Sequence, residues 1–291
     1  MPPLFERVTI AGVGLIGGSL ALAARAAGLI TEVVGYGRTE ANLRIAQERG
    51  IIDRYSFDPL VAARDADLLL VCVPVRAIAA VARACAPALR PGAVVSDVGS
   101  VKASVLRELE SCLPAGIAVV GGHPIAGTEH TGAAAAFAEL FHGQRCIITP
   151  GARAPVAAVH KVRALWEGVG MQVDVLDAEQ HDAILAWVSH LPHALAFSAV
   201  AALLDADATG AQFAGPSFRD LTRVAASSVE MWTDIFLANA AHVDDVVTRF
   251  ITALEKLRQA IARGDDEKIR QELTRAQAAR QHWNEQVSGH D

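Results

Sequence analysis

Three glycines near the start of the chain place the strongest constraint on its fold. Gly12, Gly14 and Gly17 form the pattern G-x-G-x-x-G between an apolar run, residues 8–11, and an alanine-rich run, residues 19–27. The first run predicts a buried strand and the second predicts a helix. Glycines in this setting allow a tight turn, a close approach of a pyrophosphate to the backbone, and close packing of helix on strand. The pattern therefore predicts a dinucleotide site at the N-terminus of the helix.

The turn and the strand after it contain the first residues expected to contact this cofactor. The turn supplies Gly12, Gly14, Leu15, Ile16 and Gly17. The next predicted strand, residues 32–37, is followed by Arg38 and Thr39, where an acidic residue would bind the ribose 2′-hydroxyl of NAD. An arginine can instead bind a 2′-phosphate, so we expect NAD(P) with NADP favoured over NAD. In the alternative interpretation Arg38 only stacks on the adenine, and either cofactor serves.

Strand and helix patterns alternate through the first half of the chain. Strands are predicted within DADLLLVCVP, GAVVSDVG, GIAVVGGHP, RCIITP and MQVDVL, with helical segments among them. These units predict a Rossmann-type α/β domain with a mostly parallel sheet over residues 1–176. Ligands gather beyond the carboxyl ends of parallel strands, so the loops there should meet at the cofactor. Those loops contain Val73 and Pro74, Ser100, and His123.

The segment GGHPIAGTEHTG, residues 121–132, places His123 in a run of glycines and small residues at the end of a predicted strand. Ordering so many glycines costs backbone entropy, which indicates a purpose beyond packing. Imidazole titrates near neutral pH and is therefore a candidate general base. From the residues alone, a role in stabilising the loop competes with this catalytic one.

From Ala178 onward the patterns are helical and predict an all-α domain over residues 177–291. Pro192 lies inside a long apolar helix, so a kink is expected just before it. His190 and His193 flank this position, but no third ligand has the spacing of a metal site, and we expect no metal.

Two arginines in this half, Arg219 and Arg223, lie four residues apart and should share one helical face. A solvated charged face is the ordinary interpretation of such a pair. Apolar neighbours favour a buried element instead: Phe218, Leu221, Val224 and Ala225.

A later stripe of apolar residues has the alternating spacing of a heptad repeat and predicts a helix with a dimer interface. Its members are Val243, Val247, Phe250, Leu254, Leu257 and Ile261. Gly264 is expected to end this helix and Asp265 to cap the next one. We therefore expect a homodimer formed through the helical domain.

Composition restricts the partners and the compartment. The net charge of −6 and pI near 5.9 provide no basic surface for nucleic acid or an anionic membrane. No run approaches about eighteen uninterrupted apolar residues, so no membrane span is expected. The N-terminus lacks the features of a signal peptide, and the four cysteines are scattered without CxxC spacing. These features predict a cytoplasmic protein with reduced thiols.

Six segments together resemble the prephenate/arogenate (cyclohexadienyl) dehydrogenases of tyrosine biosynthesis. They are AGVGLIGGSLALA, DVGSVK, GGHPIAGTEHTG, VSHLPHALAF, FRDLTRVAASS and MWTDIFLAN, and the similarity covers about the first 260 residues in order. The resemblance implies oxidative decarboxylation of prephenate, and possibly arogenate, with hydride transfer to NAD(P)+. The products would be 4-hydroxyphenylpyruvate or tyrosine. It also implies a helical dimerisation domain.

The resemblance assigns roles to individual residues. His123 matches the catalytic histidine, and Ser100 matches the serine that bonds the substrate hydroxyl and orients that histidine. Arg223 matches an arginine that binds a substrate carboxylate, and His193 matches a histidine that helps to bind the substrate. Arg219 stands where relatives often have lysine.

At the pocket rim, Glu129 is expected to pair with the cation of Arg219. Two departures limit the comparison: Arg38 and Thr39 replace the aspartate that ends the second strand in some relatives, and His130 replaces a lysine.

Three alternatives remain open at this point. The enzyme could be an arogenate-specific NADP dehydrogenase. A β-hydroxyacid dehydrogenase would need a lysine early in the helical domain, where this chain has none. A non-enzymatic NADP-sensing regulator would leave His123, Ser100 and Arg223 unexplained.

Overall fold

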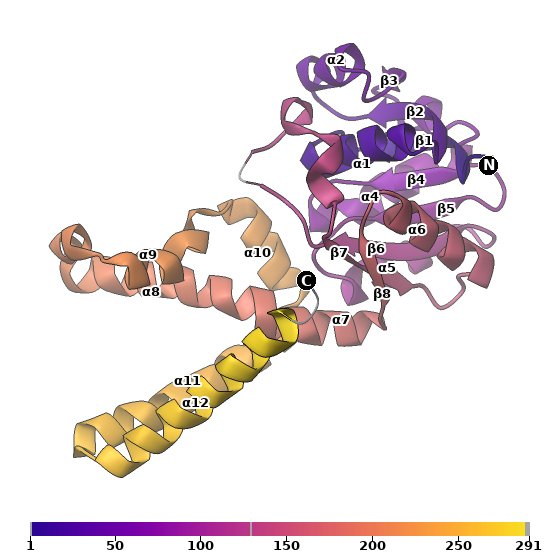
Figure 1. Ribbon diagram of the computed structural model, residues 1–291. Coiled ribbons are helices and arrows are strands. Elements are labelled where there is room, and N and C mark those ends of the chain that lie inside the picture. Colours follow the sequence, from indigo (N-terminus) through magenta and orange to yellow (C-terminus); the bar gives the residue numbers. More distant parts are fainter. Residues whose placement is uncertain (1, 129, 289–291) are drawn as a thin grey trace. The chain divides into compact units, whose positions relative to one another are not determined.

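The computed structural model describes residues 2–128 and 130–288 (Figure 1). The chain divides into two compact units, residues 1–240 and 241–291. The first unit contains an α/β part and the helices that follow it, and the second contains a pair of long helices. The boundary predicted between residues 176 and 177 lies within the first unit, between its last strand and the next helix, and stays a prediction.

One sheet of eight strands organises the α/β part, in the order β3-β2-β1-β4-β5-β6-β7-β8. The strands are β1 Phe5–Ala11, β2 Ile30–Tyr36, β3 Arg54–Ser56, β4 Leu68–Val71, β5 Val94–Asp97, β6 Ala118–Pro124, β7 Arg145–Pro150 and β8 Gln172–Val175. Neighbouring strands pair in parallel except β6 and β7, which are antiparallel. The predicted Rossmann-type domain with a mostly parallel sheet is therefore confirmed.

Two strand features were not predicted. The short strand β3 has only three residues, too few to show a period. The antiparallel β7 follows β6 through a segment whose described residues form only short 3-10 turns, Ala133–Ala135 and Ala138–Phe141. A parallel neighbour requires a long crossover, usually a helix, and the described residues of this connection form no α-helix.

The helices that connect the strands pack around the sheet (Figure 1). They are α1 Leu15–Ala26, α2 Glu40–Glu48, α3 Pro59–Ala62, α4 Ile78–Cys85, α5 Ala103–Cys112 and α6 Val156–Gly168. Helix α1 begins four residues earlier than its pattern predicts. Its first turn contains glycines, which are poor helix formers, so the sequence pattern did not indicate a helix there.

Close packing explains the glycines around this first turn. Gly12 has φ of 92°, and a Cβ there would lie 2.4 Å from the carbonyl oxygen of Cys72. A Cβ on Gly17 would lie 2.8 Å from Cγ2 of Ile10 in β1. Any larger side chain would therefore push α1 away from the sheet or open the turn.

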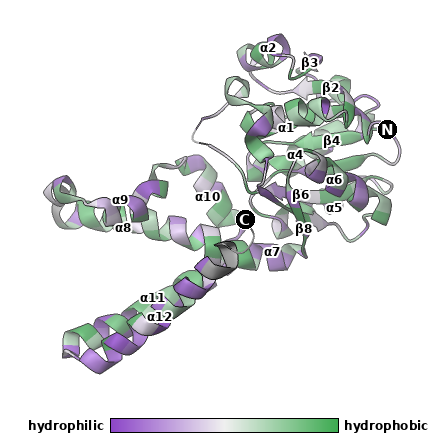
Figure 2. Cartoon of the chain, viewed as in Figure 1, coloured by the Kyte–Doolittle hydropathy of each residue, from purple (hydrophilic) through white to green (hydrophobic). Residues whose placement is uncertain are grey.

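Two apolar clusters, separated by the strands, form the core of the α/β part, and Val101, Trp232 and Ile235 form a third, smaller cluster. Trp166, Phe5 and Phe141 belong to one of the two larger clusters, and Leu69, Val95 and Leu109 belong to the other. Figure 2 shows apolar residues along the central strands, which are buried on both faces, as expected for a sheet covered by helices on both sides.

The first unit continues with helices. They are α7 Ala178–Leu185, α8 Leu191–Asp207, α9 Pro216–Thr222 and α10 Val229–Ala238. A π-helical turn, Ala186–His190, joins α7 to α8. The irregularity expected just before Pro192 therefore takes the form of this π turn, a feature frequent at functional sites.

Within the described residues, the segment Ala178–Ala206 is the one helix long and apolar enough to cross a membrane by length and composition, with a mean hydropathy of 1.4 in its most apolar window. However, its first half contains buried polar groups, His181, Asp182 and His190, and bonds to residues of the α/β part. That half belongs to the protein core.

The second unit contains the predicted heptad stripe. Helix α11 is Ala240–Arg263 and helix α12 is Asp266–Ser288. Gly264, with φ of 66°, ends α11, and the carboxylate of Asp265 accepts the backbone N–H of Lys268 at 3.0 Å. Both predicted end signals are confirmed. Leu254 and Ile261 of the stripe are more than half exposed in the single chain.

Candidate active site

A cavity of about 520 Å³ lies beside the glycine turn. Its lining includes Gly12, Gly14, Arg38, Thr39, Val73 and Pro74, all expected from the sequence to contact a cofactor. Helix α1 starts at its wall with no side-chain cap and no acidic residue in its first turn. The free backbone amides and the positive end of the helix dipole suit a pyrophosphate.

The other predicted cofactor residues lie around this cavity rather than in its lining. Leu15, Ile16 and Gly17 form the first turn of α1. Ser100 lies half-buried in the loop after β5, and His123 lies near the end of the adjacent β6. The carboxyl ends of neighbouring parallel strands therefore bring the two residues to the same edge of the sheet.

His123 is the first member of a buried hydrogen-bonded series. Its Nδ1 lies 2.8 Å from Nε2 of His181, and Nδ1 of His181 lies 2.7 Å from Oδ1 of Asp182. The Asp182 carboxylate also accepts the backbone amides of Lys102 at 2.8 Å and Ala103 at 2.9 Å. A carboxylate from α7 thus caps the start of α5 and orients the two imidazoles.

The hydrogen bonds determine where the protons lie. Burial alone would raise the pKa of Asp182, but the bonds from His181 and the two amides hold that pKa below its ordinary value. The ionised carboxylate accepts the proton on Nδ1 of His181, which leaves Nε2 of His181 as an acceptor. His123 must then donate from Nδ1, so its Nε2 carries the free lone pair.

Both imidazoles are kept neutral. Burial lowers the pKa of His123 well below its ordinary value, and the charges of His181, when protonated, and of Lys102 lower it further. Burial also lowers the pKa of His181, although Asp182 opposes the shift. A neutral histidine with a fixed tautomer is suited to accept a proton.

A buried ion pair lies beneath this series. Nζ of Lys102 contacts Oδ2 of Asp97, both side chains being fully buried, and donates to the carbonyl oxygen of Gly122 at 2.8 Å. Asp97 accepts the backbone N–H of Gly99 at 2.8 Å. The ion pair therefore forms hydrogen bonds to Gly99 and Gly122, the residues directly before Ser100 and His123.

The helical side of the site centres on His193. Its ring stacks on Trp232 with centroids 3.6 Å apart, and its Nδ1 donates to the carbonyl oxygen of Ser189 at 2.9 Å. Burial lowers the pKa of His193, the bond to Ser189 opposes this shift, and the positive charge of Arg223 adds to it.

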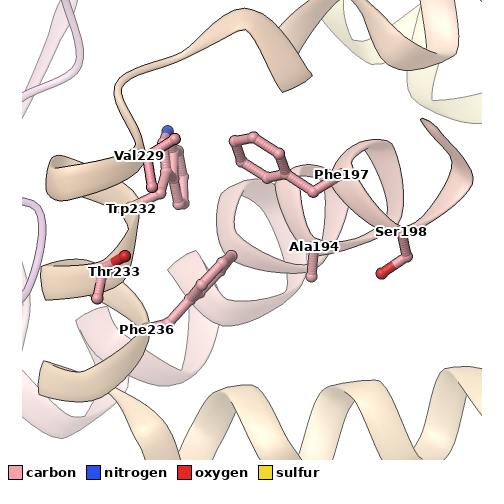
Figure 3. A pocket seen from close by; sticks show the side chains of 7 residues that line it. All are labelled: Ala194, Phe197, Ser198, Val229, Trp232, Thr233 and Phe236. Atoms are coloured by element: carbon pink, nitrogen blue, oxygen red, sulfur yellow. The ribbon is translucent and has the colours of Figure 1, made fainter. Parts of the chain in front are cut away.

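An apolar pocket of about 300 Å³ adjoins His193 through Trp232. Figure 3 shows the side chains of α8 and α10 that line it. They are Ala194, Phe197, Ser198, Val229, Trp232, Thr233 and Phe236. Next to it, the amide of Asn239 donates to the carbonyl oxygen of Asp182 at 2.9 Å and lies 3.1 Å from Nδ1 of His190. Helix α10 is thus tied to the histidine series.

One expectation about the arginines is wrong. Arg219 and Arg223 are exposed in the chain, and Leu221 between them is 55% exposed, so the element is not buried. Helix α9 has only seven residues, and Arg223 already belongs to the 3-10 turn after it. Apolar neighbours predicted burial but could not reveal that this short helix packs on α8 with only Phe218 partly buried among its apolar residues. Glu129 lies outside the described residues.

Sequence reasoning missed the residues that support His123. Asp97 and Lys102 occur within the quoted segment DVGSVK, and His181 and Asp182 occur in the long apolar helix. A charged pair in an otherwise apolar run was an available signal, because such groups are rarely buried without partners. Among the described residues, no group of three or more His, Cys, Asp or Glu side chains could hold a metal ion.

A cavity at a glycine-rich turn, with an oriented, neutral histidine at the same edge of the sheet, is typical of nucleotide-dependent oxidoreductases. Residues 20–175 match the family model described as "Prephenate dehydrogenase, nucleotide-binding domain". Residues 177–275 match the family model described as "Prephenate dehydrogenase, dimerization domain". The chain belongs to the prephenate dehydrogenase family.

Individual relatives agree with this assignment. The cyclohexadienyl dehydrogenase of Zymomonas mobilis is 40% identical over 95% of this chain and 96% of its own. The structure of Aquifex aeolicus prephenate dehydrogenase in complex with hydroxyphenyl propionate and NAD+ has a TM-score of 0.88 at 33% identity, covering 95% of this chain and 98% of that one. Synechocystis arogenate dehydrogenase has a TM-score of 0.83 at 25% identity, covering 96% and 100%.

Proposed function

We propose that this enzyme catalyses the oxidative decarboxylation of prephenate to 4-hydroxyphenylpyruvate in tyrosine biosynthesis, and that arogenate can serve as a second substrate, giving tyrosine. The observation that carries the proposal is the fixed tautomer of His123, which leaves Nε2 free at the edge of the sheet where the cofactor cavity lies. Cofactor reduction on addition of prephenate tests it, and a chain that binds cofactor but never reduces it would be the regulator instead.

His123 would accept the proton of the ring hydroxyl at Nε2. The bound nicotinamide supplies the hydride acceptor for the carbon that bears this hydroxyl. Loss of the ring carboxylate as CO2 then returns an electron pair to the ring, and the same proton can return to the oxygen, which becomes a phenol. The protein's task is to orient the ring, hold its carboxylates and move this one proton.

The substrate contacts follow from the positions around His193. Arg223 would bind a substrate carboxylate through a bidentate pair, and His193, held by Ser189 and Trp232, would bind the substrate beside it. Ser100 would bond the ring hydroxyl. Arg219 and Glu129 would form the rim of the pocket.

The cofactor is NAD(P), and we propose that NADP is favoured. Arg38 lies at the cavity wall where β2 ends, and no acidic side chain lines the cavity among the described residues. Glu32, the carboxylate of β2, is engaged by Arg7 at 2.7 Å and Arg54 at 2.9 Å instead. The 2′-phosphate of NADP would therefore meet a cation without a competing carboxylate.

Prephenate and arogenate differ by a keto group and an ammonium group on the side chain. A carboxylate near the pocket would favour arogenate, and Glu129 and Asp220 are the candidates. Steady-state kinetics of both substrates with both cofactors decide between a cyclohexadienyl dehydrogenase and an arogenate-specific NADP enzyme.

We also propose a cytoplasmic homodimer formed through the helical domain. The match to a dimerization domain supports this assembly, as do the exposed apolar residues of α11 and α12, among them Ile251, Leu254 and Leu273. Sedimentation at several concentrations measures it, and a monomer at every concentration would contradict it.

A further inference from the structure

The two buried imidazoles of the site share one hydrogen bond but differ in what lies beside them. Nδ1 of His123 lies 2.8 Å from Nε2 of His181, whose other nitrogen lies 2.7 Å from the carboxylate of Asp182. His123 is thus connected to this carboxylate through His181. His181 is fully buried, so water cannot solvate a charge on its ring. A positive charge in the series depends on the groups that the protein places beside each ring.

His181 is the ring on which a positive charge is better stabilised. The carboxylate of Asp182 bonds directly to its Nδ1. The backbone amides of Lys102 and Ala103 donate to the same carboxylate and keep it ionised. Burial lowers the pKa of His181, and the bond to Asp182 opposes the shift. Burial lowers the pKa of His123 as well, and the charged groups that act on that ring lower its pKa further. The series therefore holds a proton more favourably on His181 than on His123.

The other groups that act on His181 leave this preference in place. Lys102 and Asp97 form an ion pair, so their opposite charges act on the ring together and partly cancel. His190, from the π turn, is neutral because burial lowers its pKa to about 4. The bonded carboxylate of Asp182 therefore decides where the charge lies.

The hydrogen bonds already have the geometry for a proton to move along the series. A proton that reaches Nε2 of His123 leaves that ring with a proton on each nitrogen. When the Nδ1 proton then crosses the 2.8 Å bond, His123 is neutral again and His181 is an imidazolium paired with Asp182. No side chain has to turn, because the same atoms stay hydrogen-bonded and only donor and acceptor are exchanged.

We propose that His181 is a positioning residue that acts through His123 and holds a proton during turnover: as Nε2 of His123 takes the proton of the substrate hydroxyl, the Nδ1 proton of His123 passes to His181. The inference rests on the proposed function, which supplies the hydroxyl proton. The substrate O–H bond and the Nδ1–H bond of His123 break, and an N–H bond forms at Nε2 of each ring. The electron pair of the O–H bond stays on the substrate. Both transfers reverse when the oxygen becomes a phenol.

Two substitutions separate proton transfer from orientation. In His181→Gln the amide oxygen can accept the N–H of His123 and keep its tautomer, but an amide takes up no proton at neutral pH. The shorter His181→Asn can bond to Asp182 without reaching His123. We expect kcat for prephenate to fall about tenfold or more in both variants. In His181→Gln, the dissociation constant of hydroxyphenyl propionate at saturating cofactor should stay within about twofold of the unaltered value. A normal kcat in either variant would overturn the inference.

A control substitution lies beside His181 on α7. Gln180 is exposed, and Gln180→Ala should leave kcat unchanged. Thermal unfolding identifies any variant that does not fold. Failure of the proposed function gives a different result, since prephenate would then reduce neither cofactor with the unaltered enzyme, whichever ring holds the proton.

The order of protonation gives a readout that needs neither a variant nor a ligand. The nitrogen chemical shifts of the histidine rings, followed as the unaltered enzyme is acidified, report which imidazole becomes charged first. We expect His181 to become charged before His123. In His181→Gln the first charge must form on His123, so the acidic decrease in kcat/KM should move to lower pH. A first charge on His123 in the unaltered enzyme, or an acidic decrease that stays in place in His181→Gln, would overturn the inference.

Discussion

Nδ1 of His123 lies 2.8 Å from Nε2 of His181, and both rings are buried. Because Asp182 holds the proton of His181 on the opposite nitrogen, the pair can form in one neutral arrangement only, with His123 as donor. The carboxylate of Asp182 therefore determines, through His181, that Nε2 of His123 carries no proton. The proposed proton acceptor has the required tautomer before any ligand binds.

The pH dependence of kcat/KM follows from this arrangement. The base must be neutral, and burial, His181, Lys102 and His190 all lower the pKa of His123. The value of kcat/KM, which reports the free enzyme, should stay level from neutral pH through 6.5 and decrease only at lower pH. A pH profile measured with prephenate checks this, and an acidic decrease centred at or above pH 6.5 would be inconsistent with a buried neutral base.

Removal of one member of the buried ion pair should destabilise the protein strongly. Lys102→Met would leave the Asp97 carboxylate buried without its cation, at a cost of about 3–5 kcal/mol in the free energy of unfolding. The double variant Asp97→Asn with Lys102→Met removes both charges and should recover part of that loss. Urea unfolding measures both. Equal stability of the single variant and the unaltered enzyme would show that the pair is not buried in solution.

Arg223 should act mainly on substrate binding. A guanidinium–carboxylate pair exists in both the ground state and the transition state, so Arg223→Ala should raise KM for prephenate with little change in kcat. Loss of charged hydrogen bonds predicts an increase of about tenfold to a hundredfold. The exposed Arg83 of α4 provides the control, since Arg83→Ala should leave KM unchanged. A large fall in kcat at constant KM would argue against this role.

The cofactor preference should depend on Arg38. In Arg38→Asp a carboxylate replaces the cation that would meet the 2′-phosphate, so the ratio of kcat/KM for NADP to that for NAD should fall by about tenfold or more. Arg44→Asp, on the exposed face of α2, should keep the original ratio. If Arg38→Asp also left the ratio unchanged, Arg38 would not select the cofactor.

Local patterns predicted the features that depend on neighbouring residues. The glycine turn, the buried parallel strands, the break before Pro192 and the Gly264–Asp265 helix junction all follow from spacing and conformational preference within a few residues. The glycine-rich segment made His123 a candidate base, and the resemblance to a family favoured the catalytic role over a role in stabilising the loop.

The remaining features depend on contacts between distant segments. His181 and His123 are 58 residues apart in the sequence, and Lys102 and Asp182 are 80 residues apart, yet each pair is hydrogen-bonded. The periodicity of a helix or strand does not extend over such separations. The antiparallel direction of β7 depends on the connection from β6, whose described residues form no α-helix, and the exposure of Arg223 depends on how the short α9 packs against α8. Sequence spacing cannot reveal which distant surfaces meet.

Substitution of His123 tests the central claim most directly. His123→Asn removes the proton acceptor while it keeps a polar side chain, and the control His160→Asn alters an exposed histidine of α6. The measurement is kcat for prephenate at saturating cofactor. The account predicts that kcat falls by about 10²–10⁴-fold in His123→Asn and stays normal in His160→Asn, and a near-normal kcat in His123→Asn would contradict it.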